Sequence, residues 1–391
     1  MIPESPRGQG PGEATARARL LDVAGVFLRL GLVGFGGPAA HVAMMEDELV
    51  RRRGWLSRER FLDLLGATNL IPGPNSTEMA IHLGHLRAGW PGLIVAGTCF
   101  IAPAFAVVLA CAWAYVRFGA LPVATGLLYG VKPVIIAVVL QALWSLGRAA
   151  TRTRAIAAVG LASLGAVAAG VHELLVLFVA GAVLAGARWV DEARSSRTTH
   201  GLLPLLPIAV ATGGSAAVPF GLAPLFLFFL KVGSVLFGSG YVLLAFLRAD
   251  LVERWGWLTE GQLLDAVAVG QVTPGPVFTT ATFIGYVLGG APGAVLSTVG
   301  IFLPAFVFVA LSGPLVARIR RSPVAGAFLD GVNAASIALM ALVTAQLARA
   351  AIVDVPTLLL AVASAALLFR FRVNSAWLVV AAAAVGVALR H

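Results

Sequence analysis

Long apolar runs separated by short polar stretches make up most of this chain. Each half of the sequence contains four of them, at 90–116, 121–147, 154–171 and 173–187, and then at 291–317, 324–348, 355–369 and 373–389. About 20 residues of α-helix cross a hydrocarbon core that is ~30 Å thick, whereas the strands of membrane barrels are shorter and alternate in polarity. The pattern therefore predicts a bundle of membrane-spanning α-helices.

The small and polar residues around these runs occur twice in the same order. The motifs of the first copy recur in the second: Phe35-Gly36-Gly37 as Phe237-Gly238-Ser239, Gly54-Trp55-Leu56 as Gly256-Trp257-Leu258, Pro72-Gly73-Pro74 as Pro274-Gly275-Pro276, and Pro103-Ala104-Phe105 as Pro304-Ala305-Phe306. The offset is 202 residues up to the Pro-Gly-Pro and 201 residues from Gly84 onward. Duplicated, interrupted helices are typical of transporters, so we predict two transporter repeats at 20–190 and 222–391.

Basic residues are distributed unequally between the matched loops. Three comparisons carry this observation: Arg51, Arg52, Arg53, Arg58 and Arg60 against Asp250, Glu253, Arg254 and Glu260; Arg117 against Arg318, Arg320 and Arg321; and Arg148, Arg152 and Arg154 against Arg349 and Asp354. Loops rich in Lys and Arg stay in the cytoplasm. Because only one member of each pair is strongly basic, matched loops are predicted to lie on opposite sides, and the two repeats have inverted topology.

Inversion requires one extra crossing between the copies. The linker at 191–221 contains a weakly apolar segment, 202–218, which we expect to cross. This crossing places the N-terminus in the cytoplasm, with a disordered tail at 1–19, and the C-terminus outside. Segments 58–89 and 260–289 are predicted to be re-entrant hairpins with Pro-Gly-Pro at their tips. If they cross fully the count rises, so we expect roughly 9 to 13 crossings.

Composition supports this membrane assignment. Hydrophobic residues are 59% and charged residues 12% of the chain, whereas soluble domains are roughly 25% charged. The net charge of +10 comes from Arg residues at the ends of apolar runs, so it reports topology and not nucleic-acid binding. Cys99 and Cys111 share one apolar run, a spacing that predicts neither a disulfide nor a metal site. With no nucleotide loop or catalytic triad either, we expect no enzyme activity and no cofactor.

The duplicated Pro-Gly-Pro is the main candidate for a binding site. Proline ends a helix, and the helix that starts after it would point free N–H groups and its positive dipole end into the membrane interior, which suits an anion. The candidate residues are the two Pro-Gly-Pro turns, Asn75, Ser76 and Thr77, which we expect to be N-caps, and Thr279 and Thr280 in the second copy. The alternative is that Pro-Gly-Pro only kinks a helix.

A matched pair of cations supports an anion site. Arg29 lies in the first apolar helix and Lys231 occupies the same position in the second copy. Basic residues inside spans are costly and face a cavity or a partner. The two could neutralise a dianion, or they could form ion pairs with the matched Asp63 and Asp265. Both hold if the substrate competes with the carboxylate.

Other polar residues flank the breaks. Asn69 and Gln271 are matched amides that could bind substrate or close the unwound backbone. Glu78 and His82 lie one turn apart after the first Pro-Gly-Pro. They could relay protons, or they could form a hydrogen-bonded polar pair with no role in transport. Thr280 replaces Glu78 in the second copy.

Together these motifs resemble the chromate ion transporter family, in its long form with two homologous halves on one chain. The resemblance covers about residues 20–390. It implies efflux of chromate from a bacterial cytoplasm, inverted halves, and site residues at Arg29, Gly36, Gly37, Pro38 and the first Pro-Gly-Pro. The second copy keeps Gly238 but departs from the pattern with Ser239 and Gly240 in place of Gly37 and Pro38.

We therefore expect a secondary transporter in the bacterial inner membrane that exports chromate and confers chromate resistance. One alternative is a transporter of sulfate or another tetrahedral oxyanion, since chromate and sulfate are alike in charge and size. Another is a membrane-embedded enzyme or assembly subunit, for which Glu78 and His82 are the only hint. The expected partners are the oxyanion and the lipid bilayer, and a homodimer is left open.

Overall fold

The computed structural model describes residues 11–35, 37–69, 71–150, 153–195, 218–237, 242–319, 322–371 and 373–390. Every regular element within these ranges is helical, which confirms the all-α prediction. Of the expected disordered tail at 1–19, residues 1–10 lie outside the described residues, whereas residues 11–19 are helical. Residues 202–217 of the proposed extra crossing at 202–218 also lie outside the described residues, as do Gly36 and the segment Gly238–Gly240.

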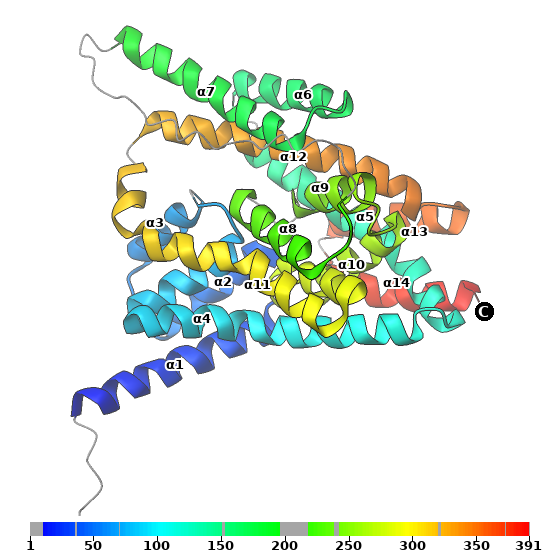
Figure 1. Cartoon of the computed structure of the whole chain (residues 1–391), viewed down its shortest axis with the longest axis horizontal. Coiled ribbons are helices and arrows are strands. Elements are labelled where there is room, and N and C mark those ends of the chain that lie inside the picture. Colours follow the sequence, from blue (N-terminus) through cyan, green and yellow to red (C-terminus); the bar gives the residue numbers. More distant parts are fainter. Residues whose placement is uncertain are drawn as a thin grey trace, which may run out of the picture.

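The first repeat runs through eight elements (Figure 1). They are α1 (Pro11–Val33), α2 (Gly37–Met45), the π-helical segment η1 (Glu46–Arg52), α3 (Arg58–Thr68), α4 (Asn75–Phe118), α5 (Pro122–Ala150), α6 (Arg154–Ala168) and α7 (Glu173–Ser195). The second repeat repeats this order. Its elements are α8 (Leu222–Val235), α9 (Leu243–Phe246), η3 (Leu247–Arg254), α10 (Glu260–Val272), η4 (Val277–Thr279), α11 (Thr280–Ile319), α12 (Pro323–Ala351), α13 (Val355–Ala366), η5 (Leu367–Phe371) and α14 (Ser375–Arg390).

Five of the described helices are long and apolar enough to cross a membrane: α4, α5, α7, the helix at 277–311 and α12. Shorter apolar helices occur at α6, α8, α13 with η5, and α14. These helices coincide with the apolar runs of the sequence: the run 121–147 begins one residue before α5, and the run 324–348 falls within α12. The chain is therefore a multi-pass membrane protein, whereas the number of crossings stays a prediction.

Local polar signals fix where the helices begin. The Ser57 hydroxyl accepts from the Arg60 N–H before α3, and Thr259 forms a capping box with Gln262 before α10. Such caps satisfy N–H groups that have no partner inside the helix. The equivalent positions of the two repeats thus start their helices in the same way.

Both α4 and α11 fold back on themselves at a matched glycine. Gly89 has φ +63° and ψ −150°, and Gly290 has φ +63° and ψ −154°, a combination that L side chains avoid. Beyond the break the chain returns antiparallel, since the hydroxyls of Thr282 and Thr298 hydrogen-bond at 2.7 Å although 16 residues separate them. Each helix is therefore two segments, 75–87 and 90–118 in α4, and 280–288 and 291–319 in α11.

The first segment of each broken helix forms a hairpin with the helix before the Pro-Gly-Pro. We call residues 58–87 the first hairpin and residues 260–288 the second hairpin. At the open end of the first hairpin, Arg53 and Arg87 both pair with Asp22 of α1, at 2.6 and 3.3 Å, and the Arg87 guanidinium lies 4.9 Å from the Trp55 ring centroid. The two ends of the hairpin therefore lie together, with Pro72-Gly73-Pro74 at the tip.

Aromatic residues join the two ends of the second hairpin, where the first hairpin uses Arg53 and Arg87. The Phe220 and Trp257 rings lie 5.4 Å apart, and the Trp257 indole donates to the Val218 carbonyl at 2.8 Å. A Cβ on Gly289, at the other end of this hairpin, would lie 3.3 Å from the Phe220 ring. Its two ends are therefore also joined, and Pro274-Gly275-Pro276 forms its tip.

The hairpins open toward opposite ends of the molecule. The second segment of α4 starts beside the first hairpin's open end at Trp90. About 38 Å further along its axis, Tyr115 donates a 2.9 Å hydrogen bond to Asp265, near the start of α10 in the second hairpin. Midway, Ala104 lies against the tip glycine Gly275. The tips are therefore central, and the two broken helices enter from opposite ends of the molecule, which is the arrangement that inverted repeats require.

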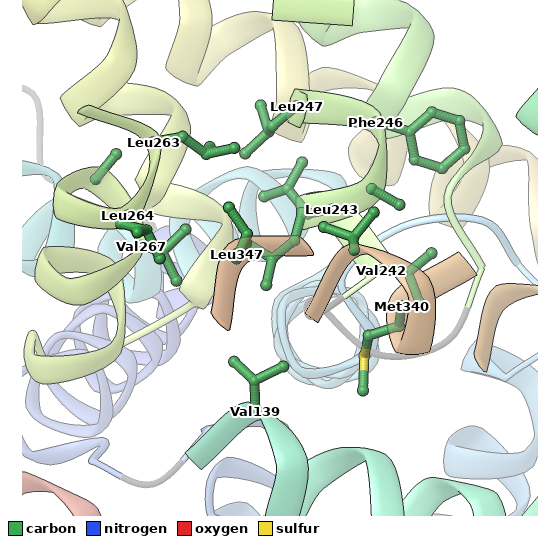
Figure 2. Packing of buried hydrophobic residues seen from close by; sticks show 14 of the residues in the cluster. Val139, Val242, Leu243, Phe246, Leu247, Leu263, Leu264, Val267, Met340 and Leu347 are labelled. Carbon is green, nitrogen blue, oxygen red and sulfur yellow. The ribbon is translucent and has the colours of Figure 1, made fainter. Parts of the chain in front are cut away.

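Side chains of the first repeat pack into the buried core of the second repeat. Val139 of α5 packs with side chains from α9, η3, α10 and α12, including Leu243, Leu264, Met340 and Leu347 (Figure 2). The N-terminal end of α1 and the C-terminal end of α14 lie at opposite ends of the long axis (Figure 1). This interlocking ties the halves together around the hairpin tips.

Candidate functional site

The two Pro-Gly-Pro turns exchange hydrogen bonds with the opposite repeat. Gly73 N–H donates to the Leu236 carbonyl at 2.8 Å, and Gly275 N–H donates to the Gly34 carbonyl at 2.7 Å. These are matched residues, since the offset of 202 relates Gly34 to Leu236 and Gly73 to Gly275. We call these four residues the crossing. Each tip therefore ends at the C-terminal end of the other repeat's first helix, α1 or α8.

Packing around the crossing follows the same symmetry. Gly73 has φ +138° and lies against Ala305, whereas Gly275 has φ +94° and lies against Ala104, so that each tip contacts the Pro-Ala-Phe motif of the opposite repeat. The positive φ values require glycine. The duplicated motifs are thus brought together as reciprocal partners across the two repeats.

At the first Pro-Gly-Pro, the residues that end α3 and cap α4 differ from those that the sequence predicted. α3 ends at Thr68, and the cap of α4 is Pro74, which makes no side-chain bond, so the prediction of Asn75, Ser76 and Thr77 as N-caps is wrong. Asn75 instead is helical and donates to the Asn69 side chain at 2.7 Å. The N-cap position is occupied by Pro74, whose ring has no acceptor, and its carbonyl accepts from the Thr77 and Glu78 N–H groups.

The hydroxyls of the second copy also bond locally. Thr279 donates to the Pro276 carbonyl and Thr280 to the Val277 carbonyl, both at 2.8 Å. Both residues are buried. Both hydroxyls therefore lie at the tip, but each donates its proton to a carbonyl of the turn itself.

The predicted cations flank the crossing at equal spacing. Arg29 precedes Gly34 by five residues and Lys231 precedes Leu236 by five, about 7.5 Å along each helix axis. Arg29 is on the exposed side of α1 and makes no ion pair among the described residues. Lys231 is half-buried, pairs with buried Asp250 at 2.6 Å and lies 5.5 Å from the Phe228 ring centroid.

The alternative pairing of the cations with Asp63 and Asp265 is wrong for Lys231. Asp265 is buried on α10 and bonds to Lys132 Nζ at 3.0 Å and to the Tyr115 hydroxyl. Asp63 is exposed on α3. The matched aspartates lie in the hairpins, nearer their open ends than their tips, and this separation keeps Asp265 from Lys231.

Two buried acid-base side chains occupy the tip region of the first repeat. The Glu78 carboxylate is fully buried against Gly73, and neither of its oxygens has a hydrogen-bond partner among the described residues. His82 Nε2, one turn later, is likewise buried without a partner. The second copy replaces Glu78 by Thr280, so this feature belongs to one repeat only.

Some site residues could not be recognised from motifs. His41 is fully buried on α2, and its Nε2 donates to the Gly34 carbonyl at 2.9 Å, so this carbonyl accepts from both repeats. Its counterpart is Leu243, and the duplication therefore gave no signal. Gly37 and Pro38 begin α2, directly after the crossing, and Gln271 lies in the last turn of α10.

A pair of oppositely charged residues exchanges its signs between matched positions of the two repeats. Glu46 pairs with Arg58 at 3.1 Å, and the matched Arg248 pairs with Glu260 at 2.6 Å with the signs reversed. Comparing charges at the fixed offset of 202 would have revealed this pair. It links η1 to α3 and η3 to α10, and so supports each hairpin at its open end.

The fold and the crossing define a class: a multi-pass α-helical membrane protein built of two inverted repeats with broken helices, which is the architecture of secondary transporters. The sequence profile described as chromate transporter matches residues 21–187 and 223–387, nearly the whole of both repeats. The chain therefore belongs to the chromate transporter family.

Curated relatives agree with this assignment. The chain is 34% identical over 365 residues to the chromate transport protein of Cupriavidus metallidurans, covering 92% of this chain and 90% of the relative. It is 35% identical over 346 residues to that of Pseudomonas aeruginosa, covering 85% and 82%. It is 31% identical to the probable chromate transport protein of Synechococcus elongatus, covering 85% and 86%. No solved structure matches the chain.

Proposed function

We propose that this protein exports chromate across the bacterial inner membrane as a secondary transporter, with the anion bound beside the crossing. The observation that carries the proposal is the reciprocal pair of bonds from Gly73 to Leu236 and from Gly275 to Gly34. These bonds bring two helix starts close together, and the positive ends of their helix dipoles favour negative charge. Arg29 and Lys231 stand five residues before Gly34 and Leu236, and they are the two cations that we assign to the anion.

Transport through this site proceeds by rocking of the two repeats. The crossing is the only direct backbone link between tips and opposite repeats that the described residues show, so it is where the halves move against each other. A dianion that leaves a cytoplasm with an inside-negative potential moves downhill by ~2.3 kcal/mol per charge per 100 mV. The membrane potential alone is therefore a sufficient driving force.

Proton coupling is a second way to drive the cycle, and Glu78 is the observation that favours it. A carboxylate that is fully buried without a hydrogen-bond partner is costly when charged. Binding and release of a proton at Glu78, with His82 one turn away, would change the charge beside Gly73 during transport. Membrane-potential drive and proton coupling differ in their response to pH.

The test is uptake into everted membrane vesicles from cells that express the protein. Radiolabelled chromate should accumulate, and collapse of the membrane potential with valinomycin and K⁺ should slow it, whereas vesicles without the protein should show neither effect. Transport of sulfate without chromate would replace the proposed substrate by another oxyanion. Purified protein that moves neither anion in liposomes would instead favour an enzyme or assembly subunit.

A further inference from the structure

A cavity of ≈ 660 Å³ lies at the end of the molecule onto which the second hairpin opens. Its walls come from the C-terminal ends of α4, α12 and α14, from α5, and from α10 and α11 of the second hairpin. The ionisable groups that line it are Tyr115, Tyr129, Lys132, Asp265 and Arg390. Two of these five are permanent or near-permanent cations, and one is a carboxylate.

The carboxylate is buried, and its polar partners among the described residues come from the opposite repeat. The Asp265 side chain is 5% exposed; its Oδ1 forms an ion pair with Lys132 Nζ at 3.0 Å, and its Oδ2 accepts a hydrogen bond from the Tyr115 hydroxyl at 2.9 Å. Asp265 belongs to the second hairpin, whereas both partners belong to the first repeat. Any movement of the second hairpin against the first repeat therefore has to break or stretch these bonds.

Lys132 faces the cavity as well as the carboxylate. Its side chain is 22% exposed and lines the cavity wall, so a ligand in the cavity can reach the ammonium. Arg390 lies on the same wall, with its guanidinium 4.4 Å from the Tyr129 ring centroid. The Tyr129 hydroxyl donates to the carboxylate of Asp354, which lies next to the cavity but does not line it. A dianion entering here meets two cations and one displaceable carboxylate.

Lys132 has no cationic counterpart at the matched position of the second repeat. At the offset of 201, Lys132 corresponds to Asn333, although Asp265 corresponds to Asp63 at the offset of 202. Because the aspartate is duplicated and the lysine is not, this lysine belongs to the first repeat alone.

We propose that the cavity is a second oxyanion site, in which Lys132 binds the transported anion and Asp265 is the counter-ion that it displaces. This inference rests on the proposed function, since the anion in the cavity is the transported one. While the cavity is empty, the Lys132 to Asp265 ion pair holds the second hairpin against the first repeat. An anion on Lys132 releases Asp265, so occupancy of the cavity frees the hairpin to move.

The test is equilibrium binding of chromate, and of sulfate in parallel, to purified protein in detergent, together with the concentration dependence of transport in proteoliposomes. Lys132→Gln should weaken anion binding by about tenfold, and Lys132→Arg should restore most of it. Asp265→Asn should strengthen binding several-fold, because it removes the competing charge while keeping the shape. Arg188→Gln, which removes an exposed cation paired with Glu192 on α7, is the control for net charge.

A binding site predicts that the two substitutions change the anion affinity in opposite directions, whereas a purely structural ion pair does not. If Lys132→Gln and Asp265→Asn both leave the affinity unchanged, or both lower it, the inference is overturned. Since Lys132→Gln leaves a buried carboxylate without its cation, the double variant Lys132→Gln with Asp265→Asn is included as a neutral pair. It should fold like the wild type and bind as weakly as Lys132→Gln. A wild-type protein that binds neither anion would instead refute the proposed function itself.

Discussion

The tip glycine Gly275 allows a quantitative test of the crossing. A Cβ at this position would lie 2.7 Å from the Ala104 Cβ, which is closer than carbon atoms pack, and the residue has φ +94°. Gly275→Ala should therefore cost about 1–3 kcal/mol of backbone strain and about 1–3 kcal/mol of overpacking. Only the second contribution depends on Ala104.

A double-mutant cycle separates the two contributions. Ala104→Gly alone should cost about 1 kcal/mol as a glycine inside a helix. Combined with Gly275→Ala, it should remove the clash and give a coupling energy of about 1–3 kcal/mol, so that the double variant is more stable than the sum of the single changes predicts. The measurement is equilibrium unfolding of the purified protein in mixed detergent micelles.

The control for this cycle is Gly54→Ala. Gly54 also has positive φ, at +60°, but a Cβ there would meet no atom within 4 Å. The change should cost about 1–2 kcal/mol of conformational strain and show no coupling to Ala104→Gly. Free energies for Gly275→Ala and Ala104→Gly that add to within about 0.5 kcal/mol would refute the contact between the second tip and α4.

The remaining predictions concern transport and orientation. Arg29→Ala should lower chromate efflux at least tenfold while the protein stays in the membrane, and normal efflux would remove Arg29 from the site. Lys231→Ala should have the same effect if both repeats share the anion, whereas an unchanged rate would mean that only the first repeat binds it. Glu78→Gln should flatten the pH dependence of transport in liposomes, and an unaltered pH profile would exclude this carboxylate as the coupling group. Single cysteines at Ser57 and Thr259, which are matched and exposed, should react with an impermeant thiol reagent from opposite sides of the membrane; labelling from one side would contradict the inversion.

The sequence alone determined the elements and their pairing. Apolar runs such as 121–147 and 324–348 became helices because a chain in lipid has to satisfy its own backbone hydrogen bonds. The duplicated motifs and the unequal loop charges indicated two inverted repeats, because both features depend only on which residues occupy which positions along the chain. Positions such as Gly73 and Gly275 were recognised because a Pro-Gly-Pro interrupts any helix.

Only the tertiary structure decided which groups meet. Matched residues at a fixed offset suggested that Lys231 would face Asp265, but each aspartate lies toward the open end of its own hairpin, so Lys231 bonds to Asp250 and Asp265 to Lys132. The tips likewise bond to the opposite repeat, which no spacing along the chain encodes. Side-chain partners depend on how separate helices are packed in space, and this packing is set by the whole bundle and not by any one segment.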